Sequence, residues 1–252
     1  VRLCFDRVVV EAAALGLLAI FPQSIRADVE TVEAFVEANL IATFYHELGH
    51  AVIEIEAVPI FGQEEDAADV FSVMMIQTIY EAESAEAIAY DAALGFWAEA
   101  EERQRMSDEI PWWDVHGPDE QRFYNTVCLF FGADPKKRRA VARDMELPQD
   151  RAERCEAEYS LAEASWGPIL DEMTDRGPGK TIRFKGRTDS LTARLLKQEV
   201  DDLNALMSLA GRLTVEVEAC GEANAFFDPE TSTITLCREF EANLRRLARS
   251  FE

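Results

Sequence analysis

Two histidines four residues apart, with a glutamate beside the first, form the part of the sequence best suited to chemistry. Residues 46–50 read His-Glu-Leu-Gly-His. In a helix both imidazoles of this pattern lie on one face and can reach one metal ion, while Glu47 points at its open coordination position. The chain has 3 histidines, and two of them fall here. The alternative is a chance match on a solvated helix, which so short a motif allows.

A second acidic motif follows shortly after His50. Residues 65–69 read Glu-Asp-Ala-Ala-Asp. Pro59 and Gly62 break the first helical pattern, so the chain can reverse and present Glu65 to the same point as the two histidines. Three protein ligands with a fourth position left to water are the catalytic arrangement of zinc, whereas structural sites are usually closed by four cysteines or histidines. The sequence contains no CxxC pair.

The chemistry that such a site predicts is hydrolysis by an activated water. Zinc lowers the pKa of its bound water to about 7, so Glu47 can act as general base and pass the proton to a leaving amine. Asp69 stands one helical turn after Glu65, where it can accept a hydrogen bond from the outer nitrogen of a zinc-bound imidazole. An ordinary exposed helix carboxylate is the other interpretation of Asp69.

The third histidine lies in a separate segment, Trp-Trp-Asp-Val-His-Gly-Pro-Asp at 112–119. Peptide hydrolysis passes through an oxyanion, which a histidine, tyrosine or arginine donor can stabilise. His116 is the first candidate for this role, with Arg122 and Tyr124 behind it. The alternative is a loop histidine whose hydrogen bonds are satisfied by a neighbouring aspartate.

Helices must hold most of these residues. An apolar stripe at helical period runs from Val32 to Ile55, and a second helix is expected to follow antiparallel to it, from Glu65 to Tyr80. Acidic runs at 81–86 and 99–102 are interpreted as solvated helix faces rather than calcium sites. The remaining helices are expected at 92–105, 120–131, 149–170 and 191–209.

The C-terminal part carries the strand signals. Residues 213–217 and 232–236 alternate between apolar and polar, and a turn-like Asp-Pro-Glu-Thr at 228–231 lies between them. Together these segments predict a β-hairpin.

The motif Glu-x-x-Ala-Asp after HExxH resembles the gluzincin branch of zinc metallopeptidases, in which the glutamate of the second motif is the third ligand. This resemblance selects Glu65 over Glu64, since Glu65 alone stands four residues before Asp69. Asn224 and Ala225, followed by an aromatic residue, resemble the edge strand on which thermolysin-like enzymes lay the substrate backbone. A plain structural hairpin is the alternative for this segment.

A second resemblance covers most of the chain. The stretches HELGHAVIE, PIFGQEEDAAD, WDVHGPDEQRFYNTVCLFFGADP and CGEANAFFDPETSTITLC resemble an uncharacterised bacterial family described as metallopeptidases. In most members the segment similar to 220–237 precedes the HExxH helix, whereas here it follows. This order indicates a circular permutation, and it predicts that the C-terminal strands pack beside the helix of His46.

The N-terminus indicates the compartment. Arg2 and Arg7 precede an apolar run at 8–21 and a cleavage site before Asp28, so residues 1–27 are interpreted as a signal peptide. The run is too short for a comfortable membrane span, and we expect no stable span after cleavage. An uncleaved anchor or a buried first helix is the alternative. The expected location is the bacterial periplasm or the exterior.

Cysteine usage agrees with that location. Without Cys4, four cysteines are left, an even number suited to two disulfides in an oxidising compartment. We expect local pairs, Cys128 with Cys155 and Cys220 with Cys237. Sequence alone allows three connectivities, and four reduced, buried thiols are the alternative.

Composition bounds the partners. With 48% hydrophobic residues, the segment 28–252 can form one domain, with a possible subdomain break near 176–180. The formal charge of -23 disfavours nucleic acid and anionic membranes and favours basic peptides.

These observations predict a mainly helical α+β, zincin-like fold with a small antiparallel sheet beside the HExxH helix. The expected activity is zinc-dependent hydrolysis of a peptide or protein. Two alternatives stay open: a catalytically silent zinc-binding or peptide-binding module on the same scaffold, and a zinc hydrolase of another amide.

Overall fold

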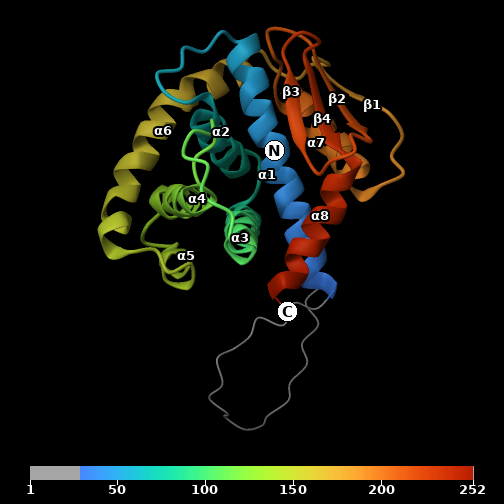
Figure 1. Cartoon of the computed structure of the whole chain (residues 1–252). Helices are drawn as coiled ribbons and strands as arrows, with labels where there is room; N and C mark the ends of the chain where they lie inside the picture. Colours follow the sequence, from blue (N-terminus) through green and yellow to red (C-terminus); the bar gives the residue numbers. More distant parts are fainter. Residues whose placement is uncertain (1–28, 252) are drawn as a thin grey trace, which may run out of the picture.

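The computed structural model describes residues 29–251, so the predicted signal peptide at 1–27 lies outside the described residues. The protein is mainly helical with one four-stranded sheet, which confirms the α+β class (Figure 1). The helices are α1 (Val29–Ile55), α2 (Glu64–Ile79), α3 (Ala82–Met106), α4 (Asp119–Ala133), α5 (Arg139–Asp144), α6 (Gln149–Asp175), α7 (Leu191–Leu206), α8 (Arg238–Ala248) and the 3-10 helix Arg249–Phe251. The strands are β1 (Ile182–Lys185), β2 (Leu213–Glu218), β3 (Ala225–Asp228) and β4 (Thr233–Cys237).

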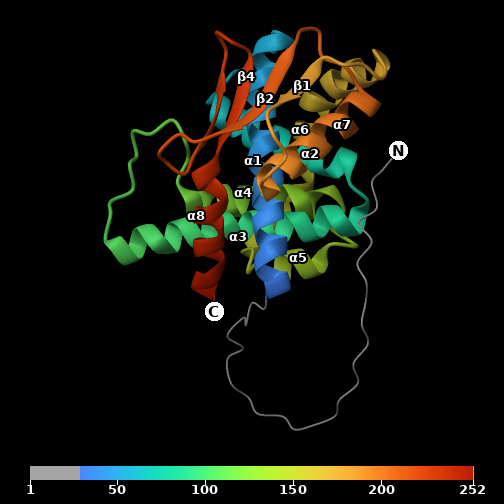
Figure 2. The same cartoon turned by 90° about the vertical axis from the view of Figure 1, so that its right-hand side faces the viewer.

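Helix α1 runs through the middle of the molecule. Helices α2, α3, α4 and α6 cover one side of it, and the sheet with α7 and α8 covers the other (Figures 1 and 2). Val36, Leu40, Phe44 and Leu48 are fully buried, as expected for a helix that packs on more than one face. The HExxH motif is therefore carried by the most enclosed element of the fold.

A close approach between α1 and α2 brings the two motifs together. A Cβ added at Gly49 would lie 3.0 Å from the Ala68 Cα, so the small residues in the two motifs let the helix backbones nearly touch. The first turn of α2 carries Glu64, Glu65 and Asp66, whose charges suit the positive end of a helix dipole. The two antiparallel helices expected from the sequence are thus present.

The sheet differs from the predicted hairpin. Its order is β1-β2-β4-β3, and β2 pairs with β4 in parallel, with Val215 opposite Ile234. The antiparallel partner of β4 is β3, with Phe227 opposite Ile234. The predicted hairpin between 213–217 and 232–236 is therefore wrong, and the sheet is mixed. Alternation reports which face of a strand is buried but not its partner, and the short β3 lacks a clear alternation.

The C-terminal elements pack beside α1, as expected. Strands β3 and β4 and helix α8 all contact α1. Arg245 of α8 makes an ion pair of 2.6 Å with Glu33, and the Phe35 and Phe251 rings lie 6.0 Å apart. The circular permutation stays a prediction.

Both local cysteine pairs form disulfides. Cys128 of α4 is bonded to Cys155 of α6, and Cys220 is bonded to Cys237 at the end of β4. Between residues 29 and 251, no helix is both long and apolar enough to cross a membrane.

Candidate metal centre

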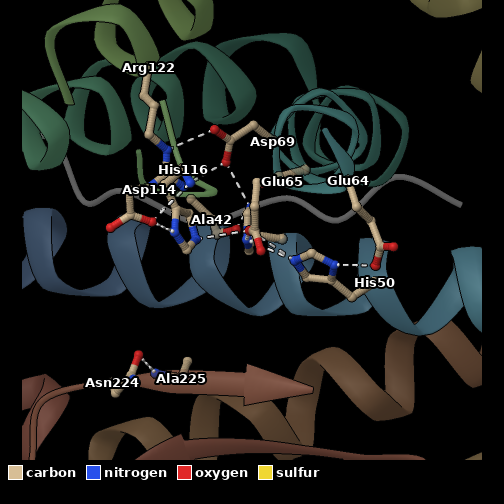
Figure 3. Close-up of polar contacts among 12 residues, drawn as sticks. Ala42, His50, Glu64, Glu65, Asp69, Asp114, His116, Arg122, Asn224 and Ala225 are labelled. Atoms are coloured by element: carbon tan, nitrogen blue, oxygen red, sulfur yellow. Dashed lines mark hydrogen bonds and ion pairs between the residues drawn. The ribbon is translucent and has the colours of Figure 1, made fainter. Parts of the chain in front are cut away.

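Three donor atoms converge at the contact of α1 and α2 (Figure 3). The His46 Nε2 atom lies 3.2 Å from the His50 Nε2 atom and 3.1 Å from the Glu65 Oε2 atom. The His50 Nε2 and Glu65 Oε2 atoms are 3.2 Å apart. Ligands bound tetrahedrally to zinc at about 2.1 Å are about 3.4 Å from one another. The three donors therefore fit three corners of a zinc site.

His116 approaches the same place from the loop between α3 and α4. Its Nε2 atom lies 2.9 Å from the Glu65 Oε2 atom, and donor atoms of His46, Glu65 and His116 all lie within 4.8 Å of one another. This second possible donor set shares two members with the first. His50 belongs to the buried helix α1, whereas the His116 side chain is 44% exposed on a loop. The third donor can therefore come either from the buried helix, as His50, or from the exposed loop, as His116.

A carboxylate and a guanidinium support His46 from behind. The Asp69 Oδ1 atom lies 2.7 Å from the His46 Nδ1 atom, and Arg122 donates two hydrogen bonds of 2.8 Å to the same carboxylate. The guanidinium also stacks over the Phe96 ring at 4.2 Å. Burial would raise the pKa of Asp69, but Arg122 and His46 outweigh it and hold that pKa well below its usual range. Asp69 is thus a charged, fixed acceptor.

The carboxylates of Asp69 and Glu65 favour the protonated form of His46 when no metal is bound. Burial would lower the pKa of His46, but hydrogen bonds to Asp69 and Glu65 raise it to about 9. Glu65 shows the converse: burial would raise its pKa, but hydrogen bonds from His116, His46 and His50 lower it strongly. A metal ion that binds here has to displace the histidine protons, as metals do at such sites.

Glu64 has a place of its own. Its Oε1 atom lies 2.8 Å from the His50 Nδ1 atom, on the side of the ring that faces away from Glu65. The two adjacent glutamates therefore serve different positions, with Glu65 at the donor cluster and Glu64 behind His50. The sequence motif indicates only which of the two glutamates is the candidate ligand, and it does not predict the contact of Glu64 with His50.

Glu47 lies inside the molecule next to the donors. Its side chain is only 6% exposed, and burial raises its pKa. It lines a cavity of about 230 Å³ that also touches His46 and His116. A carboxylate in this position can accept and return a proton within the cavity.

The cavity walls come from distant parts of the chain. Residues one helical turn apart line it from α1, α2, α3 and α4, and α8 and the start of β3 complete it. Asn224 and Ala225 are among the lining residues, and β3 runs along α1 on the side away from α2 (Figure 3). Tyr124 does not line the cavity: its ring packs 5.0 Å from the Phe123 ring, and the α4 residues that line the cavity are Arg122, Thr126 and Phe130.

Glu99 corrects one sequence expectation. The acidic run at 99–102 predicts a solvated helix face, but Glu99 is partly buried and lines the cavity. Burial is the main cause that raises its pKa, to about 7. Ala92, Gly95, Phe96 and Glu99 share one face of α3, and the packing of α3 beside α1 turns that face toward the cavity.

Comparisons with known proteins place the chain in a family. No curated protein and no solved structure matches the chain. A family model matches residues 10–170 and 186–251, which is most of the sequence. The chain belongs to the DUF4344 family, whose description reads "Putative metallopeptidase".

Proposed function

We propose that the protein is a zinc-dependent peptidase in which His46, His50 and Glu65 hold the ion. The observation that carries this proposal is the near-equal spacing of the three donor atoms, 3.1 to 3.2 Å, beside the buried Glu47. Two imidazoles and one carboxylate are the donor set of several catalytic zinc sites. Zinc bound there would polarise both a water molecule and the scissile carbonyl group.

In this proposal each residue around the donor cluster has a separate role in the reaction. Glu47 accepts a proton from the attacking water and returns it to the departing amine nitrogen. Asp69 fixes the tautomer and orientation of His46. His116, with its Nε2 atom beside Glu65, donates a hydrogen bond to the oxyanion. This assignment follows the gluzincin pattern suggested by the two motifs.

The substrate backbone lies along β3 in this proposal. Strand β3 pairs with β4 along one edge, and Asn224 and Ala225 at its start line the cavity. An extended peptide that adds to the other edge would cross the cavity in front of Glu47. The cavity next to Glu47 favours catalysis over a silent binding module. The two disulfides support a periplasmic or secreted location.

The test compares Glu47→Gln with Glu54→Gln, an exposed glutamate on the same helix. Zinc content and cleavage of a peptide library are measured for both variants and the parent. We expect Glu47→Gln to keep zinc but to lose roughly 10²- to 10⁴-fold in kcat/KM, and Glu54→Gln to match the parent. Equal cleavage by all three proteins would refute the proposal. Cleavage of a non-peptide amide, without cleavage of any peptide, would favour the alternative that the protein is a zinc hydrolase of another amide.

A further inference from the structure

The polar side chains Asn39 and Ser72 in the cavity wall already have hydrogen-bond partners within the protein. The Asn39 side chain donates hydrogen bonds to the carbonyl oxygens of Phe35 at 2.8 Å and Asp91 at 2.9 Å. Ser72 donates one of 2.8 Å to the carbonyl oxygen of Ala42. These polar side chains therefore connect the helices that form the cavity wall, and their hydrogen-bond donors do not need a polar group of a ligand.

The charged groups of the lining are also occupied, with one exception. Asp69 and Arg122 neutralise each other through two hydrogen bonds, and His46 faces the donor cluster. Glu47 is assigned to proton transfer. Glu99 lines the same cavity but makes no hydrogen bond or ion pair with any residue in 29–251.

The surroundings of Glu99 are unfavourable for a lone carboxylate. It is partly buried, and the nearby carboxylates of Asp119 and Glu102 repel its charge, while Arg122 and His116 attract it. Arg122 is already bound to Asp69. A partly buried charge without a partner costs free energy that a cation brought by a ligand would recover.

We propose that Glu99 is a specificity-determining residue that binds a cationic group of the peptide, an ammonium or a guanidinium, next to the scissile bond. This inference rests on the proposed peptidase function, because it assigns the substrate class of that site. The formal charge of -23 acts in the same direction, since it attracts basic peptides to the whole molecule. Glu99 adds selection at one position of the peptide.

The first test uses peptides that differ at one position on either side of the cleaved bond. The position carries lysine, arginine, norleucine or glutamate, and each peptide is made with a free and an acetylated N-terminus. We expect kcat/KM for lysine or arginine to exceed that for norleucine on the order of tenfold. A preference for lysine over norleucine that is the same in free and acetylated peptides would show that the bound cation is the side chain, whereas no preference at this position together with a fall in kcat/KM on acetylation would show that it is the terminal amine.

Two variants assign the preference to Glu99. We expect Glu99→Gln to bring the ratio of kcat/KM for lysine over norleucine to about one. Glu83→Gln removes the same charge from an exposed position of the same helix and retains both rate and ratio. A ratio unchanged in Glu99→Gln, or lost equally in Glu83→Gln, would overturn the inference.

A binding measurement separates this inference from the peptidase proposal. The same peptides, with free and with acetylated N-termini, are titrated by isothermal titration calorimetry into zinc-loaded Glu47→Gln and into the double variant that also carries Glu99→Gln. Tighter binding of lysine over norleucine that disappears in the double variant supports the role of Glu99, whether or not the parent cleaves any peptide. Absence of cleavage by the parent would refute only the peptidase proposal. Equal affinities of zinc-loaded Glu47→Gln for the lysine and norleucine peptides, with no loss of affinity on acetylation, would refute the role of Glu99.

Discussion

The Asp69 carboxylate lies 2.7 Å from the outer nitrogen of His46, and the same carboxylate is held by both hydrogen bonds of Arg122. Three elements, α1, α2 and α4, therefore meet at one imidazole ring. The orientation of that ring is set by the fold before any metal binds.

Weakening this support should weaken zinc binding. We expect Asp69→Asn to raise the zinc Kd by roughly 10- to 100-fold, because the amide cannot replace the charged acceptor. Competition with a chromogenic chelator measures the change. Asp66→Asn, an exposed position in the same helix, serves as the control. An unchanged Kd in Asp69→Asn would show that the contact is not linked to the metal.

His50 and His116 should differ in what their removal does. His50→Ala removes one of three evenly spaced donors, so stoichiometric zinc binding should be lost. His116→Ala should keep zinc and lose about 10²-fold in kcat, because only a donor to the oxyanion is removed. Metal analysis after dialysis, together with steady-state kinetics, measures both effects. Loss of zinc in His116→Ala with zinc retained in His50→Ala would reverse the two assignments.

The cluster of proposed metal donors was predictable because its members are close in sequence. His46, His50 and Glu65 lie within 20 residues on two helices, so helical periodicity and one reversal bring them together. Local rules are sufficient for such a site. The helical class and the two cysteine pairs likewise depended on patterns that the sequence displays directly.

The missed features depend on contacts between distant segments. Glu99 reads as one charge in an acidic run, and only the packing of α3 beside α1 turns it toward the cavity. The parallel pairing of β2 with β4 requires the chain to pass through β3 first. Neither periodicity nor composition states which remote element will be the neighbour.

Gly95 should be intolerant of a side chain. A Cβ added there would lie 1.9 Å from Asn39 Oδ1, inside the crossing of α1 and α3. We expect Gly95→Ala to lower the free energy of unfolding by about 2 to 3 kcal/mol. Gly167→Ala, with no heavy atom within 4 Å of the added Cβ, should instead add up to about 1 kcal/mol through helix propensity. Urea unfolding followed by circular dichroism compares the two, and equal stabilities would contradict the crossing geometry.

Stability of the metal-free protein should depend on the charge of Glu99. Burial, with repulsion from Asp119, raises the folded-state pKa of Glu99 from 4.5 to about 7, against the attraction of Arg122. The folded state therefore holds this proton more tightly than the unfolded state, and stability falls as pH rises between these two values. Between pH 5 and 8, Glu99→Gln should gain up to about 2 kcal/mol relative to the parent.

Urea titrations at several pH values measure this difference, with Glu83→Gln as the control. The gain of Glu99→Gln should grow as the pH rises from 4.5 to about 7 and should level off at higher pH. A difference that does not vary with pH would show that the Glu99 carboxyl group is ionised equally in both states.

The two walls of the cavity are synthesised at different times, because they lie far apart in the sequence. The donors and Asp69 are complete by residue 69, whereas the opposite wall begins at residue 223 and includes Phe240 and Leu244. During synthesis α1 and α2, which carry the proposed donors, therefore leave the ribosome more than 150 residues before the opposite wall of the cavity. On the proposed function, a growing chain that lacks the residues from 223 onward would already carry the proposed donors but would have no complete cleft in which to cut a neighbour or itself.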